Sequence, residues 1–136
     1  MKQEALDEGS VGQANVLGAA ITWAEELREM QEGEGGERSM RFDISAVSIG
    51  EHAVVGLAGE VFFEYAMNIA ERSPFERTSV LGTTNGCVAY IPTAAEMPHG
   101  GYEVQSSNRY YRQLELKPEA EGVILNEAEV LLRDLR

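Results

Sequence analysis

The sequence predicts an α+β fold, built in α/β layers, with a mixed sheet that includes a hairpin and with three main helices. Three observations support this prediction. Apolar residues follow the helical period in three separate stretches of the chain. Two short runs rich in β-branched residues are joined by a tight glycine turn, which is typical of a hairpin. Strand and helix patterns also alternate, which favours helices layered on a sheet.

The three predicted helices span residues 10–31, 61–73 and 121–136. Ser10 is suited to cap the first helix, and Pro74 stops the second because proline cannot continue a helix. Each stretch carries one apolar stripe, made respectively of Leu17, Ala20, Ile21, Ala24 and Leu27; of Phe62, Tyr65, Ala66, Ile69 and Ala70; and of Ile124, Ala128, Leu131 and Leu135.

The predicted strands span residues 41–49, 52–57 and 78–82. Gly50 and Glu51 form the turn between the first two, so that part of the sheet is antiparallel. The glycine-rich, charged stretch 32–39 reads as an exposed connection between the first helix and this hairpin.

Length and composition indicate one globular domain, or part of one, over residues 1–136. Apolar residues make up 43% of the chain, which is enough for a core. The net charge of −12 repels phosphate backbones, so nucleic acid is not expected as a partner. No apolar run reaches the ~20 residues of a membrane span, and the first ten residues lack the pattern of a secretory signal.

Residues 83–108 hold turn-forming and polar residues without a sustained period. A loop-rich stretch of that length inside a compact domain is usually functional. We therefore expect a site there.

Glu60 is the first candidate, because it lies between the end of a buried strand and the start of a helix. The helix N-terminus would stabilise its carboxylate, and Gly56 and Gly59 would let a ligand approach. The simpler interpretation is that Glu60 only caps the helix, and position alone favours it.

Tyr90 and Tyr102 are the second candidates, since a phenol can donate to an oxyanion or bind a metal. On residue types alone, two packed rings with locally satisfied hydroxyls are the more common outcome. His52 and His99 show no metal-ligand spacing. The single cysteine, Cys87, is interpreted as a small core residue rather than a nucleophile.

Two segments resemble the neutral ceramidase family. The first, SIGEHAVVGLAGEVFFEYAMNI (residues 48–69), is similar to the family's strand that leads into Pro-Gly-Glu and a helix. The second, NGCVAYIPTAAEMPHGGYEVQSS (residues 85–107), resembles the segment that begins with Asn, passes through Tyr-Ile/Val-x-Thr and reaches Tyr-Glu. The resemblance covers roughly residues 42–107 and includes the turn at residues 73–75.

This resemblance implies the C-terminal part of a zinc-dependent amide hydrolase, which cleaves an N-acyl sphingoid base such as ceramide into a fatty acid and an amine. Glu60 and Tyr90 match zinc ligands, and Tyr102 matches the phenol that faces the reacting amide. Zinc polarises a carbonyl and lowers the pKa of bound water toward ~7. At matching positions, the resemblance also implies substrate-binding roles for Asn85, Thr93 and Glu103.

The chain departs from the family pattern in three places. Ala58 replaces the usual proline before Gly-Glu, and Thr83 replaces an aromatic residue before Asn85. The family's two zinc-binding histidines lie in a preceding half of the catalytic domain, so this chain alone would bind zinc weakly and be inactive. We therefore expect a complementing N-terminal half or a homo-oligomer. The sequence itself leaves the location open, and the resemblance implies a secreted or membrane-facing one. The alternative is a non-catalytic α+β interaction module.

Overall fold

The computed structural model describes residues 11–32 and 39–136, which fall into two compact units that divide after Met40. In the first unit, helix α2 (Val11–Glu32) confirms the predicted first helix. Ser10, its expected cap, and most of the predicted glycine-rich connection lie outside the described residues. The candidate site belongs entirely to the second unit.

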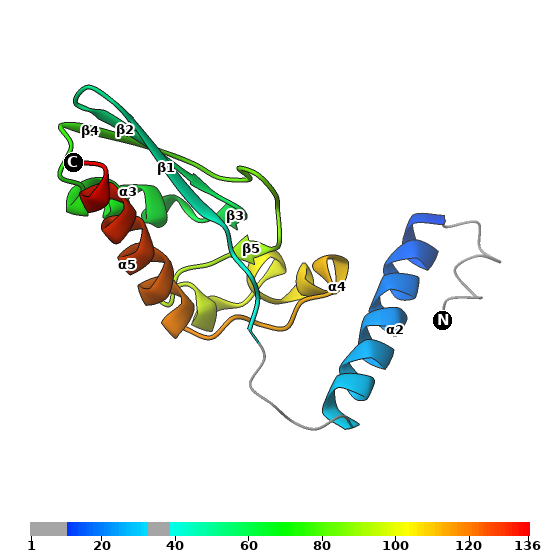
Figure 1. Ribbon diagram of the computed structural model, residues 1–136. Helices are drawn as coiled ribbons and strands as arrows, with labels where there is room; N and C mark the ends of the chain where they lie inside the picture. Colours follow the sequence, from blue (N-terminus) through cyan, green and yellow to red (C-terminus); the bar gives the residue numbers. More distant parts are fainter. Residues whose placement is uncertain (1–10, 33–38) are drawn as a thin grey trace. The chain divides into compact units, whose positions relative to one another are not determined.

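The second unit contains a mixed three-stranded sheet in the order β1-β2-β4, which confirms the predicted α+β class (Figure 1). Strands β1 (Ile44–Ile49) and β2 (His52–Leu57) pair antiparallel, with Ile49 opposite His52. Gly50 turns the hairpin with a φ of 58°, a left-handed conformation that suits glycine. Strand β1 begins three residues later than predicted, because its pairing ends where Ile44 meets Leu57, the last residue of β2.

Strand β2 is the central strand, and β4 (Arg77–Leu81) pairs with it in parallel. Helix α3 (Phe63–Arg72) connects these two strands and packs against β4, while α5 (Glu119–Asp134) packs against β1 and α3. Figure 1 shows both helices beside the sheet. The central position of β2 explains its nearly continuous apolar sequence, which is typical of buried parallel strands.

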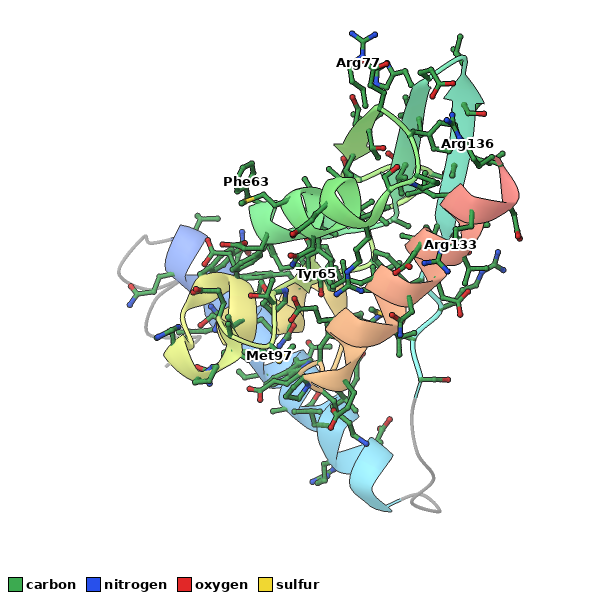
Figure 2. The ribbon with its side chains drawn as sticks, turned by 90° about the vertical axis from the view of Figure 1, so that its left-hand side faces the viewer. Phe63, Tyr65, Arg77, Met97, Arg133 and Arg136 are labelled. Carbon is green, nitrogen blue, oxygen red and sulfur yellow. The ribbon has the colours of Figure 1, made fainter. Side chains whose placement is uncertain are left out.

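The core lies between the sheet and these two helices. It consists of buried apolar side chains from β2, α3, the loop after β4, and α5, the largest of which are Leu57, Tyr65, Ile69, Ile91 and Leu132. Tyr65 reaches from α3 toward the loop-rich region, and Figure 2 shows it in the interior of this unit. Its hydroxyl donates a hydrogen bond to the backbone carbonyl of Pro92 at 3.3 Å.

The predicted loop-rich stretch contains short elements, and the sequence shows no periodic pattern for them. They are the two-residue strand β5 (Tyr90–Ile91), the 3₁₀ turn η1 (Met97–His99), the π-helical turn η2 (Tyr102–Ser106) and the single-turn helix α4 (Asn108–Tyr111). Helix α3 also begins two residues later than predicted. The reason is that Val61 forms part of a short strand, β3 (Glu60–Val61), which pairs in parallel with β5.

The residues that follow helix α5 contact the β1–β2 hairpin. Arg136, just after the helix, forms an ion pair with Glu51 in the β1–β2 turn, and its guanidinium lies 5.3 Å from the centre of the Phe75 ring. Figure 2 shows Arg133 and Arg136 near this end of α5. None of the helices in the described ranges is both long and apolar enough to span a membrane.

Candidate functional site

Glu60 and Tyr90 lie directly opposite each other in the β3–β5 pair. Backbone hydrogen bonds hold this register: the amide of Glu60 donates to the carbonyl of Ala89 at 2.9 Å, and the amide of Phe62 donates to the carbonyl of Ile91 at 3.2 Å. Two of the residues that the family resemblance assigns to a metal site are therefore neighbours through main-chain pairing.

Gly59 permits this close approach. A Cβ atom at this position would lie 2.7 Å from the Cγ1 atom of Ile91 and 3.1 Å from the carbonyl oxygen of Ala89. Both atoms belong to the segment that forms β5, so any side chain here would press against the strand that carries Tyr90. Packing therefore requires a glycine at position 59, directly before Glu60 in the sequence.

The carboxylate of Glu60 is held by side chains rather than by a helix. The hydroxyl of Tyr111 donates a hydrogen bond to its Oε1 atom, and the thiol of Cys87 lies 3.7 Å from the same oxygen. The hydrogen bonds from Tyr111 and Tyr90 lower the pKa of Glu60, with a smaller contribution from Cys87. The interpretation of Glu60 as a helix cap is wrong, because the N-cap of α3 is Phe62 and Glu60 lies in β3.

Four tyrosines are linked by ring contacts, and two of them, Tyr90 and Tyr111, interact with this carboxylate. The ring of Tyr90 meets those of Tyr102 and Tyr111 edge to face, at centroid distances of 5.9 and 6.0 Å, and Tyr110 lies 6.5 Å beyond Tyr102. Such arrangements match the positive edge of one ring to the negative face of the next. The cluster connects β5, η2 and α4, and these elements also pack on one another.

Two hydroxyls of this cluster, those of Tyr90 and Tyr111, are weaker acids than an ordinary tyrosine. Hydrogen bonding to Glu60, followed by desolvation, raises the pKa of Tyr90 to about 12. The pKa of Tyr111 is also raised, first of all by its hydrogen bond to Glu60. At neutral pH, Tyr90 and Tyr111 are therefore neutral phenols beside an ionised carboxylate, and both can act as hydrogen-bond donors.

The other predicted site residues differ in their exposure and in whether they interact with Tyr90. Tyr102 is 49% exposed at the start of η2, where it contacts Tyr90. The charge of Glu103 acts on Tyr90, so this residue also lies close by. Asn85 is exposed in a left-handed turn with a φ of 60°. Thr93 is only 3% exposed, and its backbone carbonyl accepts the amides of Glu96 and Met97 at the start of a turn.

The histidines do not reach the site. His52 is half-buried on the hairpin, where its Nε2 atom is 3.0 Å from the hydroxyl of Ser79. His99 is exposed, and its Nδ1 atom lies 3.4 Å from a carboxylate oxygen of Glu96. The interpretation of Cys87 as a core residue is wrong: it is exposed, because it precedes β5 at the surface beside Glu60.

Two site residues were missed from the sequence, Tyr111 and Cys87. Tyr111 ends the single turn α4, and the chain reverses directly after it at Arg112, which has a φ of 55°. The only sequence signal for it is the aromatic pair Tyr110-Tyr111 in a polar setting. Cys87 lies inside the resembling segment, but nothing in its neighbours marks it as exposed.

An open groove borders Glu60 on another side. Its volume is about 430 Å³. It is lined by Glu60 and seven uncharged residues: Val61, Phe62, Phe63, Ala66, Val80, Gly82 and Thr83. The site therefore combines an ionised carboxylate, a cluster of phenols and an adjoining apolar surface.

The described residues do not complete a zinc site. Glu60 and Tyr90 provide two adjacent oxygen donors, whereas a catalytic zinc usually has three protein ligands. Within residues 11–32 and 39–136, no group of three His, Cys, Asp or Glu side chains is placed to hold a metal ion. Any zinc bound at Glu60 and Tyr90 would need further ligands from outside the described ranges.

Comparison of the chain with known protein families, with curated proteins and with solved structures gave no match. The relation to neutral ceramidases therefore depends on the two resembling segments and is a hypothesis.

Proposed function

We propose that this chain provides one side of the active site of a zinc-dependent amide hydrolase similar to neutral ceramidases. The observation that carries the proposal is the pairing of Glu60 with Tyr90, with Tyr102 in contact with Tyr90. The resemblance assigns these three residues to one site, and the fold brings them together from two separate segments. A chance resemblance in two segments would not require this convergence.

In the proposed reaction, water adds to the carbonyl carbon of a lipid amide such as ceramide. The C–N bond then breaks, the nitrogen takes up a proton, and a fatty acid and an amine are released. Tyr102 is suited to donate a hydrogen bond to the oxygen that becomes negative, because it is half-exposed and its ring contacts that of Tyr90. Hydrogen-bond donors aimed at such an oxygen are among the largest contributions to catalysis of acyl transfer.

The proposal requires further metal ligands from a complementing N-terminal half or from a second subunit. A suitable test uses the longest natural form of the protein, in which zinc content and hydrolysis of an N-acyl sphingoid base are measured together. We expect bound zinc and turnover in the wild type, loss of zinc in Glu60→Gln, and a decrease in turnover of about 100-fold or more in Tyr102→Phe.

Glu64→Gln is the matched control, because Glu64 is an exposed carboxylate on the first turn of α3. It should retain both zinc and activity. If the longest form holds no zinc and its Glu60→Gln variant behaves like the wild type, the hydrolase proposal is wrong.

The second candidate is a non-catalytic α+β interaction module that kept the hydrolase scaffold. It is favoured by the incomplete ligand set of the described residues and by exposed apolar side chains on the sheet, namely Val47, Ile49 and Leu81. Absence of zinc together with a stable complex between this chain and another protein would favour it over the hydrolase.

A further inference from the structure

The strand that carries Tyr90 is held from two sides. On one side, β5 pairs with β3. On the other side, two side chains bond to the backbone just after β5. The hydroxyl of Tyr65 on α3 donates to the carbonyl of Pro92 at 3.3 Å. The amide of Ala94 donates to the Oε2 atom of Glu121 on α5 at 2.7 Å. Both anchors lie within four residues of Tyr90 in the chain.

Glu121 occupies a position at which a glutamate commonly caps its own helix. It is the third residue of α5, and Pro118 is the N-cap of that helix. A glutamate at this third position commonly accepts the backbone amide of the N-cap residue. Proline has no backbone N–H, so α5 offers Glu121 no such partner. Its carboxylate instead accepts the amide of Ala94, which belongs to a different segment of the chain.

Glu121 also acts on the second anchor. Tyr65 is fully buried, and burial followed by the charge of Glu121 raises the pKa of its hydroxyl. The hydroxyl therefore stays protonated and can donate to the carbonyl of Pro92. Thr93, between the two anchored residues, is buried, and its carbonyl accepts two amides of the following turn. Each residue from 92 to 94 therefore has a backbone hydrogen bond.

We infer that Glu121 is a positioning residue, whose carboxylate holds the segment after β5 so that Tyr90 stays against Glu60. Its effect is indirect, because the bond is made to the backbone of Ala94, four residues after Tyr90. The inference deepens the proposed function and rests on it for any effect on a metal site. The anchoring itself requires neither zinc nor substrate, so it can be tested without them.

Two conservative variants separate the reach of this side chain from its charge. Glu121→Gln keeps an oxygen that can accept the amide of Ala94 but removes the charge. Glu121→Asp keeps the charge on a side chain that is one methylene shorter. We expect the first variant to retain the anchor, and Glu121→Asp and Glu121→Ala to lose it. Glu119→Ala is the matched control, because Glu119 is an exposed carboxylate in the same turn of α5.

Amide hydrogen exchange of this chain, in the presence of a metal chelator, measures how firmly β5 is held. The amides of Glu60 and Phe62 donate to the carbonyls of Ala89 and Ile91, so they report on this pairing. In Glu121→Ala and Glu121→Asp, both amides should exchange about tenfold faster, which is the effect of losing one typical hydrogen bond. In Glu121→Gln and Glu119→Ala, and for the amides of β2 in all variants, exchange should be unchanged.

Three results would overturn the inference. The first is unchanged exchange of both reporter amides in Glu121→Ala, or in Glu121→Asp if the alanine variant does not fold. The second is equal acceleration throughout β2, because Glu121 would then contribute only to global stability. The third is the reverse pattern, in which Glu121→Asp is unchanged and Glu121→Gln exchanges faster, because the charge would then matter rather than the anchored position.

These results are separate from those that judge the hydrolase. Zinc content and amide turnover are measured on the longest natural form with Glu121 intact, whereas exchange is measured without metal. Absence of turnover would leave the anchoring intact, and failure of the anchoring would leave the hydrolase proposal standing.

Discussion

The hydroxyl of Tyr111 donates a hydrogen bond to the carboxylate of Glu60, although the two residues are 51 positions apart in the sequence. This contact links α4 to β3 and is the largest cause of the lowered pKa of Glu60. It therefore joins the end of the loop-rich region to the strand that carries the central carboxylate.

Tyr111→Phe should raise the pKa of Glu60, because the substitution removes the strongest hydrogen bond to the anion while keeping the ring. NMR titration of the Glu60 side-chain carbon measures this directly. Tyr110→Phe is the control, since Tyr110 is exposed at the edge of the cluster. An unchanged titration in Tyr111→Phe would mean that the contact is absent in solution.

The folded protein should become less stable in acid partly through Glu60. Its pKa is lower in the folded state than the ~4.3 of an unfolded glutamate. The stabilisation is therefore present above pH ~4.3 and is lost as the pH falls through the lowered folded value. Urea unfolding across this acid range should give a shallower pH dependence for Glu60→Gln than for the wild type, and identical slopes would contradict the prediction.

Alkaline pH should act through Tyr90 with the opposite sign. Its folded pKa of about 12 exceeds the ~10 of an unfolded tyrosine. The corresponding stabilisation is complete below pH ~10 and is lost as the pH rises through about 12. In Tyr90→Phe, the phenolate absorbance change near pH 12 should decrease and this loss of stability should disappear. A full-size absorbance change in the variant would assign it to another tyrosine.

Gly59→Ala should destabilise the protein by about 1–3 kcal/mol, because the new Cβ atom would clash with the side chains of Ile91 and Phe42 and lie tightly against the carbonyl of Ala89. It should also move Glu60 away from Tyr90. Gly122→Ala is the matched control: no atom lies within 4 Å of the new Cβ in α5, so it should stabilise the helix by about 0.5–1 kcal/mol. Urea unfolding of both variants tests the pair, and equal effects would contradict the packing argument.

Tyr65→Phe should cost about 1–2 kcal/mol of unfolding free energy. The ring stays buried, but the carbonyl of Pro92 loses the hydroxyl that donates to it. Chemical denaturation measures this loss. A neutral substitution would indicate that water replaces the hydroxyl at this carbonyl.

Regular periodicity explains which parts of the fold could be predicted. Three elements carry a pattern of at least six residues: the alternation in β1, the apolar run of β2 and the apolar stripe of α3. Patterns of this length are enough to predict a strand or a helix. Strands β3 and β5 have two residues each, which is too short for any period. Their pairing depends on tertiary packing around Gly59, and propensity alone could not reveal it.

Some residues of the candidate site could be predicted from the sequence, and others could not. Residue type and resemblance predicted a site at Glu60, Tyr90 and Tyr102, and the fold brings these three residues together. Tyr111 was missed because its position depends on the chain reversal at Arg112, a non-glycine residue in the left-handed region that carries no sequence signal. Cys87 was assigned to the core because residue type was the only information available for it.

The register between β3 and β5 is set by main-chain hydrogen bonds, which persist whichever side chains occupy the two facing positions. Substitutions at Glu60 or Tyr90 can therefore alter the chemistry of this surface without altering its geometry. A single mutation at either position can therefore change the ligand or the reaction during evolution. The distance between the two backbone positions stays the same, because the strand pairing sets it. Directed evolution restricted to these two positions would draw on that property.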